Sequence, residues 1–185
     1  MIIGILLVES STPFKKDMFK QLYSFNGKRM IEYSIEELLP VVDHLLIITN
    51  SSCEFTSSIK NVTVLINNIP DRKASIQVGM DYLRYFKVEK VIIHDSARPF
   101  VRSEHFSKLL EYPYAQYILK LTNGLFCISD NCSVPRDNYY ELCTPIAMDY
   151  LVIPGYVPDE FSDVVQCNRK FIEGNQSFLR KITLN

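Results

Sequence analysis

Short apolar runs alternate with amphipathic stretches along most of this 185-residue chain. Three of the stretches repeat apolar side chains at the three- and four-residue spacing of a helix. The apolar runs have the length of buried strands and occupy residues 2–8, 45–48, 62–66, 91–93 and 115–121. Such alternation predicts an α/β fold of three layers, in which a mostly parallel sheet is covered by helices on both faces.

Residues that cap or break helices set the expected limits of the helices. We predict a first helix over residues 28–39, which Pro40 ends because proline lacks the backbone N–H that a helix needs. Asp71 is placed to cap a second helix, and Ser103 to cap a third, since both side chains accept hydrogen bonds from the first turn.

The alternation of apolar strands and amphipathic helices stops after Leu121. Asn123-Gly124 is typical of a hairpin turn, and the following residues up to about 140 are mostly polar. Tyr139 and Tyr140 could pack against the domain or contact a partner, and we interpret them as packing residues because aromatic side chains usually serve burial.

The composition fits one globular domain over residues 1–185, with 47% hydrophobic and 22% charged residues. A net charge of −1 gives no electrostatic reason to expect a nucleic-acid partner. The apolar start is too short to span a membrane and meets Glu9 at once, so we expect no membrane association. The five cysteines, without a C-x-x-C pair, indicate reduced thiols in a cytoplasmic protein. Cys127 and Cys132 have no His or Cys companion nearby in the sequence, so a metal pair is not favoured.

The candidate chemistry is concentrated in residues 94–102, His-Asp-Ser-Ala-Arg-Pro-Phe-Val-Arg, directly after a predicted strand. Ligands of open α/β sheets bind at the carboxyl ends of the strands. Asp95 could hold a divalent cation there, and Arg98 could bind phosphate. Alternatively, Asp95 caps the turn and Arg98 lies on the surface. We interpret His94 as a core histidine bonded to the backbone rather than a general base.

These nine residues resemble the signature of the cytidylyltransferases that load a polyol or sugar phosphate onto CTP. Two kinds of enzyme share it: the methylerythritol phosphate enzymes of isoprenoid synthesis and the ribitol phosphate enzymes. Further segments are similar to the family's motifs and occur in the family's order, at residues 18–36, 71–75, 134–145 and 171–183. The resemblance implies a nucleotidyltransferase-like, Rossmann-like α/β/α fold. It also implies a shortened arm around residues 123–140 that pairs two subunits into a homodimer.

The same resemblance implies roles for individual residues. Asp95 would hold Mg²⁺ and, with Lys20 and Lys181, form the catalytic set. The nucleotide-binding positions would be Lys15, Lys16, Arg72, Ser75 and Arg98, and the substrate-phosphate positions would be Arg136, Thr144, Ser162 and Asp163. In the family, the residue at the position of Arg136 reaches across from the other subunit. Taken singly, each has a plainer interpretation: Lys20 and Lys181 as surface lysines, and Arg98 as a brace for its loop.

One segment departs from the family. Its glycine-rich phosphate loop corresponds to residues 9–17, which contain no glycine but include Glu9 and Pro13. Glycine lets backbone N–H groups approach phosphates closely, and losing one such donor costs roughly 10²–10³ in rate. Three hypotheses therefore stay open. The first is a working or weakened transferase of CMP from CTP to a polyol or sugar phosphate, with release of pyrophosphate. The second is an inactive family member that acts as a binding or scaffold protein, and the third is a related domain that uses another nucleotide.

Overall fold

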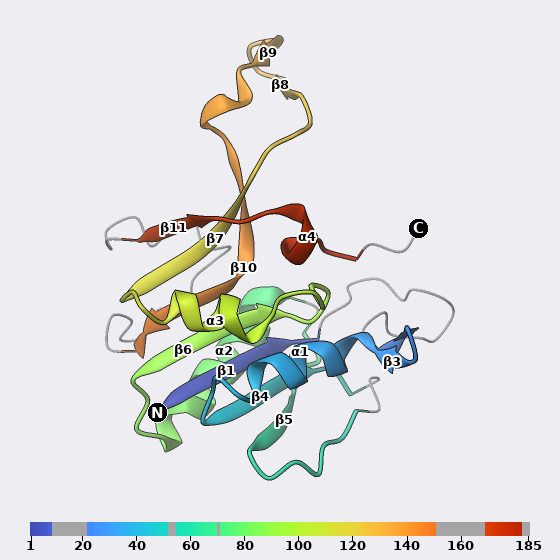
Figure 1. Ribbon diagram of the computed structural model, residues 1–185, viewed down its shortest axis with the longest axis vertical. Coiled ribbons are helices and arrows are strands. Elements are labelled where there is room, and N and C mark those ends of the chain that lie inside the picture. Colours follow the sequence, from blue (N-terminus) through green and yellow to red (C-terminus); the bar gives the residue numbers. More distant parts are fainter. Residues whose placement is uncertain (9–21, 52–54, 70, 151–168, 183–185) are drawn as a thin grey trace.

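The chain folds around one large sheet. The computed structural model describes residues 1–8, 22–51, 55–69, 71–150 and 169–182. Within these residues, seven strands form the sheet in the order β11-β7-β10-β6-β1-β4-β5 (Figure 1). Every neighbouring pair is parallel except the two made by β10, which runs antiparallel to β6 and to β7. The bounds are β1 Ile2–Leu7, β4 His44–Thr49, β5 Val62–Ile66, β6 Lys90–Asp95, β7 Tyr114–Lys120, β10 Tyr140–Asp149 and β11 Lys170–Glu173. The predicted mostly parallel sheet is confirmed.

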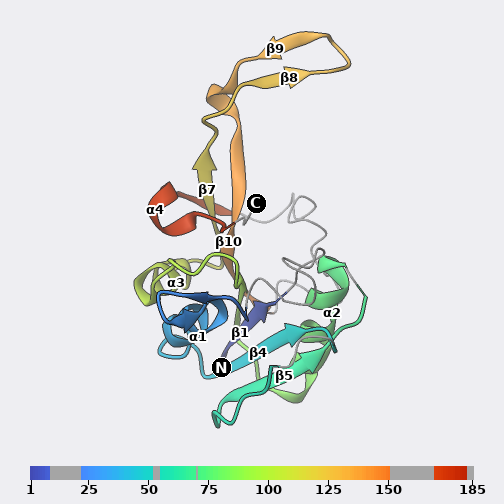
Figure 2. The same cartoon turned by 90° about the vertical axis from the view of Figure 1, so that its right-hand side faces the viewer.

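Helices cover both faces of this sheet (Figure 2). On one face lie α1 (Met30–Leu38), α3 (Ser103–Leu109) and the short α4 (Gln176–Leu179). The other face is covered by α2 (Arg72–Tyr82) and the 3₁₀ turn η2 (Leu83–Tyr85). This confirms the three-layer α/β/α architecture. No helix among the described residues is long and apolar enough to cross a membrane.

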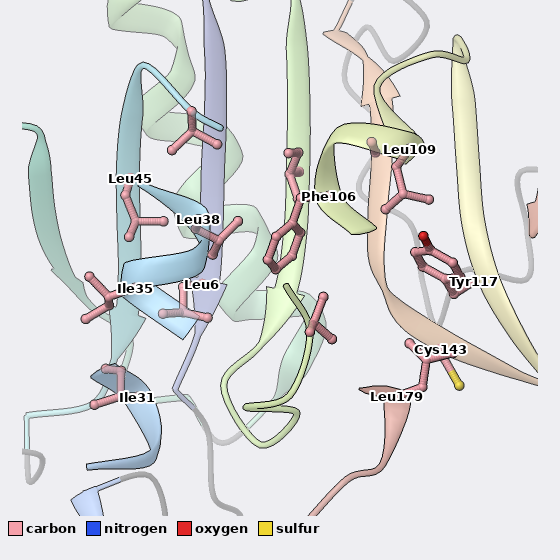
Figure 3. Packing of buried hydrophobic residues seen from close by; sticks show 14 of the residues in the cluster. Leu6, Ile31, Ile35, Leu38, Leu45, Phe106, Leu109, Tyr117, Cys143 and Leu179 are labelled. Carbon is pink, nitrogen blue, oxygen red and sulfur yellow. The ribbon is translucent and has the colours of Figure 1, made fainter. Parts of the chain in front are cut away.

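Two apolar clusters, one on each face, hold the layers together. Successive strand residues point to opposite faces, so Leu6 packs with α1 and α3 while Ile5 and Leu7 pack with α2. Figure 3 shows the first cluster, in which side chains from three helices meet those from the sheet. Its labelled members are Leu6, Ile31, Ile35, Leu38, Leu45, Phe106, Leu109, Tyr117, Cys143 and Leu179.

Strand β6 is central, as predicted. Its residues Val91, Ile92 and Ile93 are all 0% exposed, which requires helices above and below. The strand ends at Asp95, so this carboxylate lies at the carboxyl edge of the middle of the sheet.

The first predicted helix begins later than expected. Lys28–Arg29 forms a short strand, β3, that pairs with β2 (Ser24–Phe25) in a hairpin. Asn26 and Gly27 make its turn with φ values of 51° and 80°, a region that asparagine and glycine tolerate best. Helical spacing of the apolar residues does not reveal this hairpin, so the prediction of helix from residue 28 is wrong.

Of the two predicted helix caps, one is confirmed and one is wrong. Asp71 caps α2 as predicted, and its Oδ2 accepts a hydrogen bond from the Ala74 N–H at 2.7 Å. Ser103, in contrast, is the first residue of α3 and not its cap, which is Arg102. The Ser103 hydroxyl instead donates to the Glu37 carbonyl at 2.8 Å, so it joins α3 to α1.

The arm, defined here as residues 121–139 joining β7 to β10, projects beyond the sheet (Figures 1 and 2). It contains β8 (Leu125–Cys127), β9 (Cys132–Val134) and the 3₁₀ turn η3 (Arg136–Asn138). The expected turn at residues 123–124 is wrong, because β8 and β9 are joined by residues 128–131. The interpretation of Tyr139 and Tyr140 as packing residues is also wrong, since they are 48% and 39% exposed.

Candidate active site

Asp95 is the centre of the candidate site. It is the last residue of β6, and its Oδ1 accepts a hydrogen bond from the Ala97 N–H at 2.9 Å. The turn that follows is closed by the Arg98 N–H, which donates to the Asp95 carbonyl at 3.0 Å. One carboxylate oxygen is therefore used by the turn, and Oδ2 is directed to other groups.

Two cations converge on Oδ2 from distant parts of the chain. Lys181 follows α4, and its Nζ lies 3.1 Å from Asp95 Oδ2. Arg72 opens α2, and its Nη1 lies 3.9 Å from the same oxygen. These residues are 86 and 23 positions from Asp95, so the contacts are a product of the fold and not of local sequence.

The start of α2 is fixed by polar contacts that point Arg72 toward the sheet. Asp71 caps the helix, and one turn further on the Ser75 hydroxyl accepts a hydrogen bond from Asn67 Nδ2 at 2.7 Å. Asn67 follows β5, and its side-chain oxygen accepts from the Ile69 N–H at 3.0 Å. Ser75 is only 1% exposed and so joins α2 to the carboxyl end of the sheet.

The local charge favours an anionic ligand. Burial alone would raise the pKa of the Asp95 carboxyl, but the charges of Lys181 and Arg72 and the bond from Ala97 together lower it. Asp95 is therefore ionised at neutral pH. Within the described residues, two cations face this one carboxylate, an arrangement that suits phosphate oxygens.

Arg98 lies close to this group but has different partners. It is 7% exposed, and its Nη1 donates to the carbonyl of Leu179, the last residue of α4. Its Nη2 lies 3.3 Å from Glu141 Oε1 on β10. Sequence reasoning missed Glu141, since an exposed-type residue 43 positions away carries no local signal for this contact.

Thr144 and Arg136 occupy contrasting places. Thr144 is 4% exposed on β10, where Ile146 lies opposite Ile93 of β6, so it is at the same end of the sheet as Asp95. Arg136 lies in the arm and donates to the Thr122 carbonyl. Within one chain, the structure does not bring Arg136 to the Asp95 group.

His94 is a core residue, as predicted, but neither ring nitrogen has a hydrogen-bond partner among the described residues, so the expected bond to the backbone is wrong. His94 is 0% exposed and packs edge-to-face on Phe106, with ring centroids 5.0 Å apart. Burial, opposed by the charge of Asp95, lowers the pKa of the imidazole to about 3. A group that stays neutral and buried does not serve as a general base near neutral pH.

The described residues contain no cluster of three or more His, Cys, Asp or Glu side chains that could enclose a metal. Asp95 alone still fits Mg²⁺, which proteins often hold through one or two carboxylates while substrate phosphates and water complete its shell. The remaining predicted site residues, Lys15, Lys16, Lys20, Ser162 and Asp163, lie outside the described residues.

Comparison with known proteins decides the family. The family model described as 2-C-methyl-D-erythritol 4-phosphate cytidylyltransferase matches residues 9–120, which is more than half of the chain. The chain belongs to this family. The match includes Asp95, Arg72 and Ser75, whereas Arg136 and Lys181 lie beyond it.

Curated relatives with this name are similar over longer stretches. The protein of Thermotoga neapolitana is 28% identical over 143 residues, covering 71% of this chain and 64% of the relative. That of Thermosipho africanus is 28% identical over 170 residues, covering 83% of this chain and 75% of the relative. The chain thus spans a little under two thirds of the first relative's length.

Solved structures share the fold. The 4-diphosphocytidyl-2C-methyl-D-erythritol synthase of Anaerococcus prevotii superposes with a TM-score of 0.74 at 21% sequence identity. This superposition covers 99% of the present chain and 92% of the Anaerococcus chain. The 2-C-methyl-D-erythritol 4-phosphate cytidylyltransferase of Thermus thermophilus superposes with a TM-score of 0.75 at 17% identity, over 100% of the present chain and 94% of the Thermus chain.

Proposed function

We propose that this chain transfers CMP from CTP to a polyol phosphate and releases pyrophosphate, and that the acceptor is 2-C-methyl-D-erythritol 4-phosphate. Family membership supports the reaction type, and the names of the curated relatives support the acceptor. The observation that carries the proposal is the convergence of Lys181 and Arg72 on Asp95 at the carboxyl end of the central strand.

In this reaction an acceptor phosphate oxygen attacks the α-phosphorus of CTP and expels pyrophosphate, without a covalent intermediate on the protein. The protein must align two anions and neutralise the charge that builds up between them. Arg72 and Lys181 supply two cations that face one point from opposite sides of the sheet edge. We expect Lys20 to add a third cation toward the triphosphate.

Magnesium fits this arrangement through Asp95. When bound, the ion would neutralise triphosphate charge and polarise the phosphate oxygens. The residues' own part is to hold Asp95 ionised and oriented: Ala97 fixes one carboxylate oxygen, and Lys181 keeps the carboxyl deprotonated.

We also propose a homodimer formed through the arm. Five large apolar side chains in and beside the arm are between 39% and 88% exposed: Phe126, Ile128, Tyr139, Tyr140 and Leu142. Large exposed apolar side chains grouped on one segment favour a protein interface. A second subunit's arm would also bring an Arg136 toward the Asp95 group, which one chain alone does not do.

A second candidate function rests on the sequence of residues 9–17. This stretch contains no glycine and places Glu9 where the family has its phosphate loop. A carboxylate beside a triphosphate opposes binding, so this feature favours an inactive family member that binds a protein partner.

Calorimetry distinguishes the two functions. The wild-type chain is titrated with CTP, ATP, GTP and UTP, each with Mg²⁺, and Asp95→Ala and Asp81→Ala are titrated with CTP. The enzymatic proposal expects CTP to bind most tightly and expects Asp95→Ala to lose that binding. Asp81→Ala should keep it, because Asp81 pairs only with Gln77 and Arg84 among the contacts of the described residues and touches no group of the candidate site. Absence of binding for all four nucleotides at millimolar concentration would overturn the enzymatic proposal and favour the scaffold.

A further inference from the structure

Arg98 is surrounded by protein groups and not by open space. Its backbone closes the turn after Asp95, and its side chain is 7% exposed. The guanidinium donates to the Leu179 carbonyl and pairs with Glu141 at 3.3 Å. Since Glu141 neutralises it, Arg98 adds no net charge to the candidate site.

The segment after α4 is fixed to the same turn at two points. The Leu179 carbonyl accepts from Arg98, and the Ile182 N–H donates to the Ala97 carbonyl at 2.9 Å. Lys181 lies between these two anchors, and its Nζ is 3.1 Å from Asp95. Its side chain is 48% exposed, so packing alone does not hold it there.

We infer that Arg98 is a positioning residue that holds the segment after α4 against the turn, so that Lys181 reaches Asp95. This inference rests on the proposed function for its catalytic consequence, but its structural part does not. Glu141, at the start of β10, extends the chain of contacts to the base of the arm. A direct role in phosphate binding would require Arg98 to leave both Glu141 and Leu179.

Hydrogen–deuterium exchange tests the structural part without any enzymatic activity. In Arg98→Met, the peptide covering residues 176–182 should exchange at least about tenfold faster, because one of its two anchors is lost. Peptides from β1 and β6 should keep the wild-type rate, which shows that the variant is folded. Arg102→Met is the matched control, since Arg102 pairs with Glu37 on α1 and should leave residues 176–182 unchanged. Unchanged exchange in Arg98→Met would overturn the inference.

A double-mutant cycle on kcat/KM tests the catalytic consequence. If Arg98 acts through Lys181, Arg98→Met should cost almost nothing further once Lys181→Met is present. Losses that multiply would instead place Arg98 on the substrate and overturn the positioning role. Arg98→Lys should recover part of the activity only in the chain that keeps Lys181. If the wild-type chain releases no pyrophosphate, the proposed function fails, and the exchange measurement alone decides the role of Arg98.

A separate observation concerns two cysteines in the arm. Cys127 on β8 lies directly opposite Cys132 on β9 in an antiparallel pair. Opposed residues have Cα atoms about 4.5–5.5 Å apart, within the range of about 4.4–6.8 Å that a disulfide spans. Both side chains point to the same face, Cys132 is exposed and Cys127 is half-buried. The neighbouring Phe126 points to the opposite face, so an interface formed by that side chain leaves the thiols accessible.

We propose that Cys127 and Cys132 are an oxidisable pair that forms a disulfide across the β8–β9 hairpin. A small disulfide such as oxidised glutathione is the oxidant. The thiolate of one cysteine attacks it, expels one glutathione thiolate and forms a mixed disulfide. The second thiolate then attacks the protein sulfur and expels the other glutathione. The protein loses two protons and two electrons, and the glutathione disulfide is reduced to two thiols.

Mass spectrometry of the whole chain, treated with oxidised glutathione and then alkylated, tests this pair. Peptide mapping should find Cys127 linked to Cys132, while Cys143, at 1% exposure, is alkylated only after unfolding. Cys132→Ser should stop at the mixed glutathione disulfide on Cys127, because no second thiol resolves it. A stable mixed disulfide in the wild-type chain, or linkage of either cysteine to another residue, would overturn the proposal.

Discussion

The buried His94 should make the folded state lose stability as the pH falls below neutrality. The imidazole is 0% exposed against Phe106, and burial, opposed by the charge of Asp95, lowers its pKa from 6.5 to about 3. In the unfolded chain the same group titrates near its ordinary pKa of about 6.5. Between these two pKa values, the His94 imidazole is therefore protonated in the unfolded state and neutral in the folded state.

The magnitude follows from the gap between the two pKa values. Each pH unit between them reduces the free energy of unfolding by about 1.4 kcal/mol. Acidification from about pH 7 to about pH 5 crosses roughly 1.5 of these units, which costs about 2 kcal/mol. The loss continues until the pH reaches the folded pKa of about 3.

Urea unfolding followed by circular dichroism measures this loss at both pH values. His94→Gln, which cannot titrate, should reduce the difference between the two pH values by about 2 kcal/mol relative to wild type. His44→Gln is the control, because His44 is only partly buried and should leave most of the difference in place. Equal pH dependence in wild type and His94→Gln would show that the buried imidazole is not the cause of the loss.

Three further predictions concern the candidate site, the packing of α4 and the assembly. Lys181→Met should raise the pKa of Asp95, because the cation 3.1 Å away is lost. Carbon-13 NMR of the Asp95 carboxyl measures this pKa, and an unchanged pKa would contradict the prediction. Gly174→Ala should destabilise the chain by about 1–3 kcal/mol, because its Cβ would lie 2.3 Å from a buried Leu179 methyl; Gly124→Ala, with nothing within 4 Å, should have little effect in the same unfolding assay. Light scattering should give the mass of a dimer for the whole chain and of a monomer once the arm is shortened, whereas a monomeric wild type at high micromolar concentration would contradict the proposed interface.

Most of the parallel strands of the sheet could be predicted from the sequence, because apolar runs and helix caps are local signals. Asp71 as the cap of α2 and Asp95 at the end of a central strand were both predictable in this way. Strand β10 was not, since proline lacks the backbone N–H of a ladder and Pro145 therefore argues against a strand at this place. The sheet tolerates Pro145 because the register with β7 shifts between Cys143 and Ile146.

The candidate site could be predicted only in part from the sequence. Motif resemblance singled out Asp95, Arg72 and Lys181, and the structure brings these three together. Their distances, and the pairing of Arg98 with Glu141, depend on contacts between residues far apart in the chain. Such contacts have no periodicity or spacing that a sequence could display.

Phosphorus-31 NMR of CTP mixed with 2-C-methyl-D-erythritol 4-phosphate, Mg²⁺ and the wild-type chain is the decisive test of the proposed cytidylyltransferase activity. A new diphosphate diester and free pyrophosphate should appear in equal amounts. Omission of the acceptor should abolish both products, and Asp95→Ala should produce neither while remaining folded. Spectra of CTP and acceptor that stay unchanged with folded wild-type protein would contradict the claim that the Asp95 group is the centre of a cytidylyltransferase.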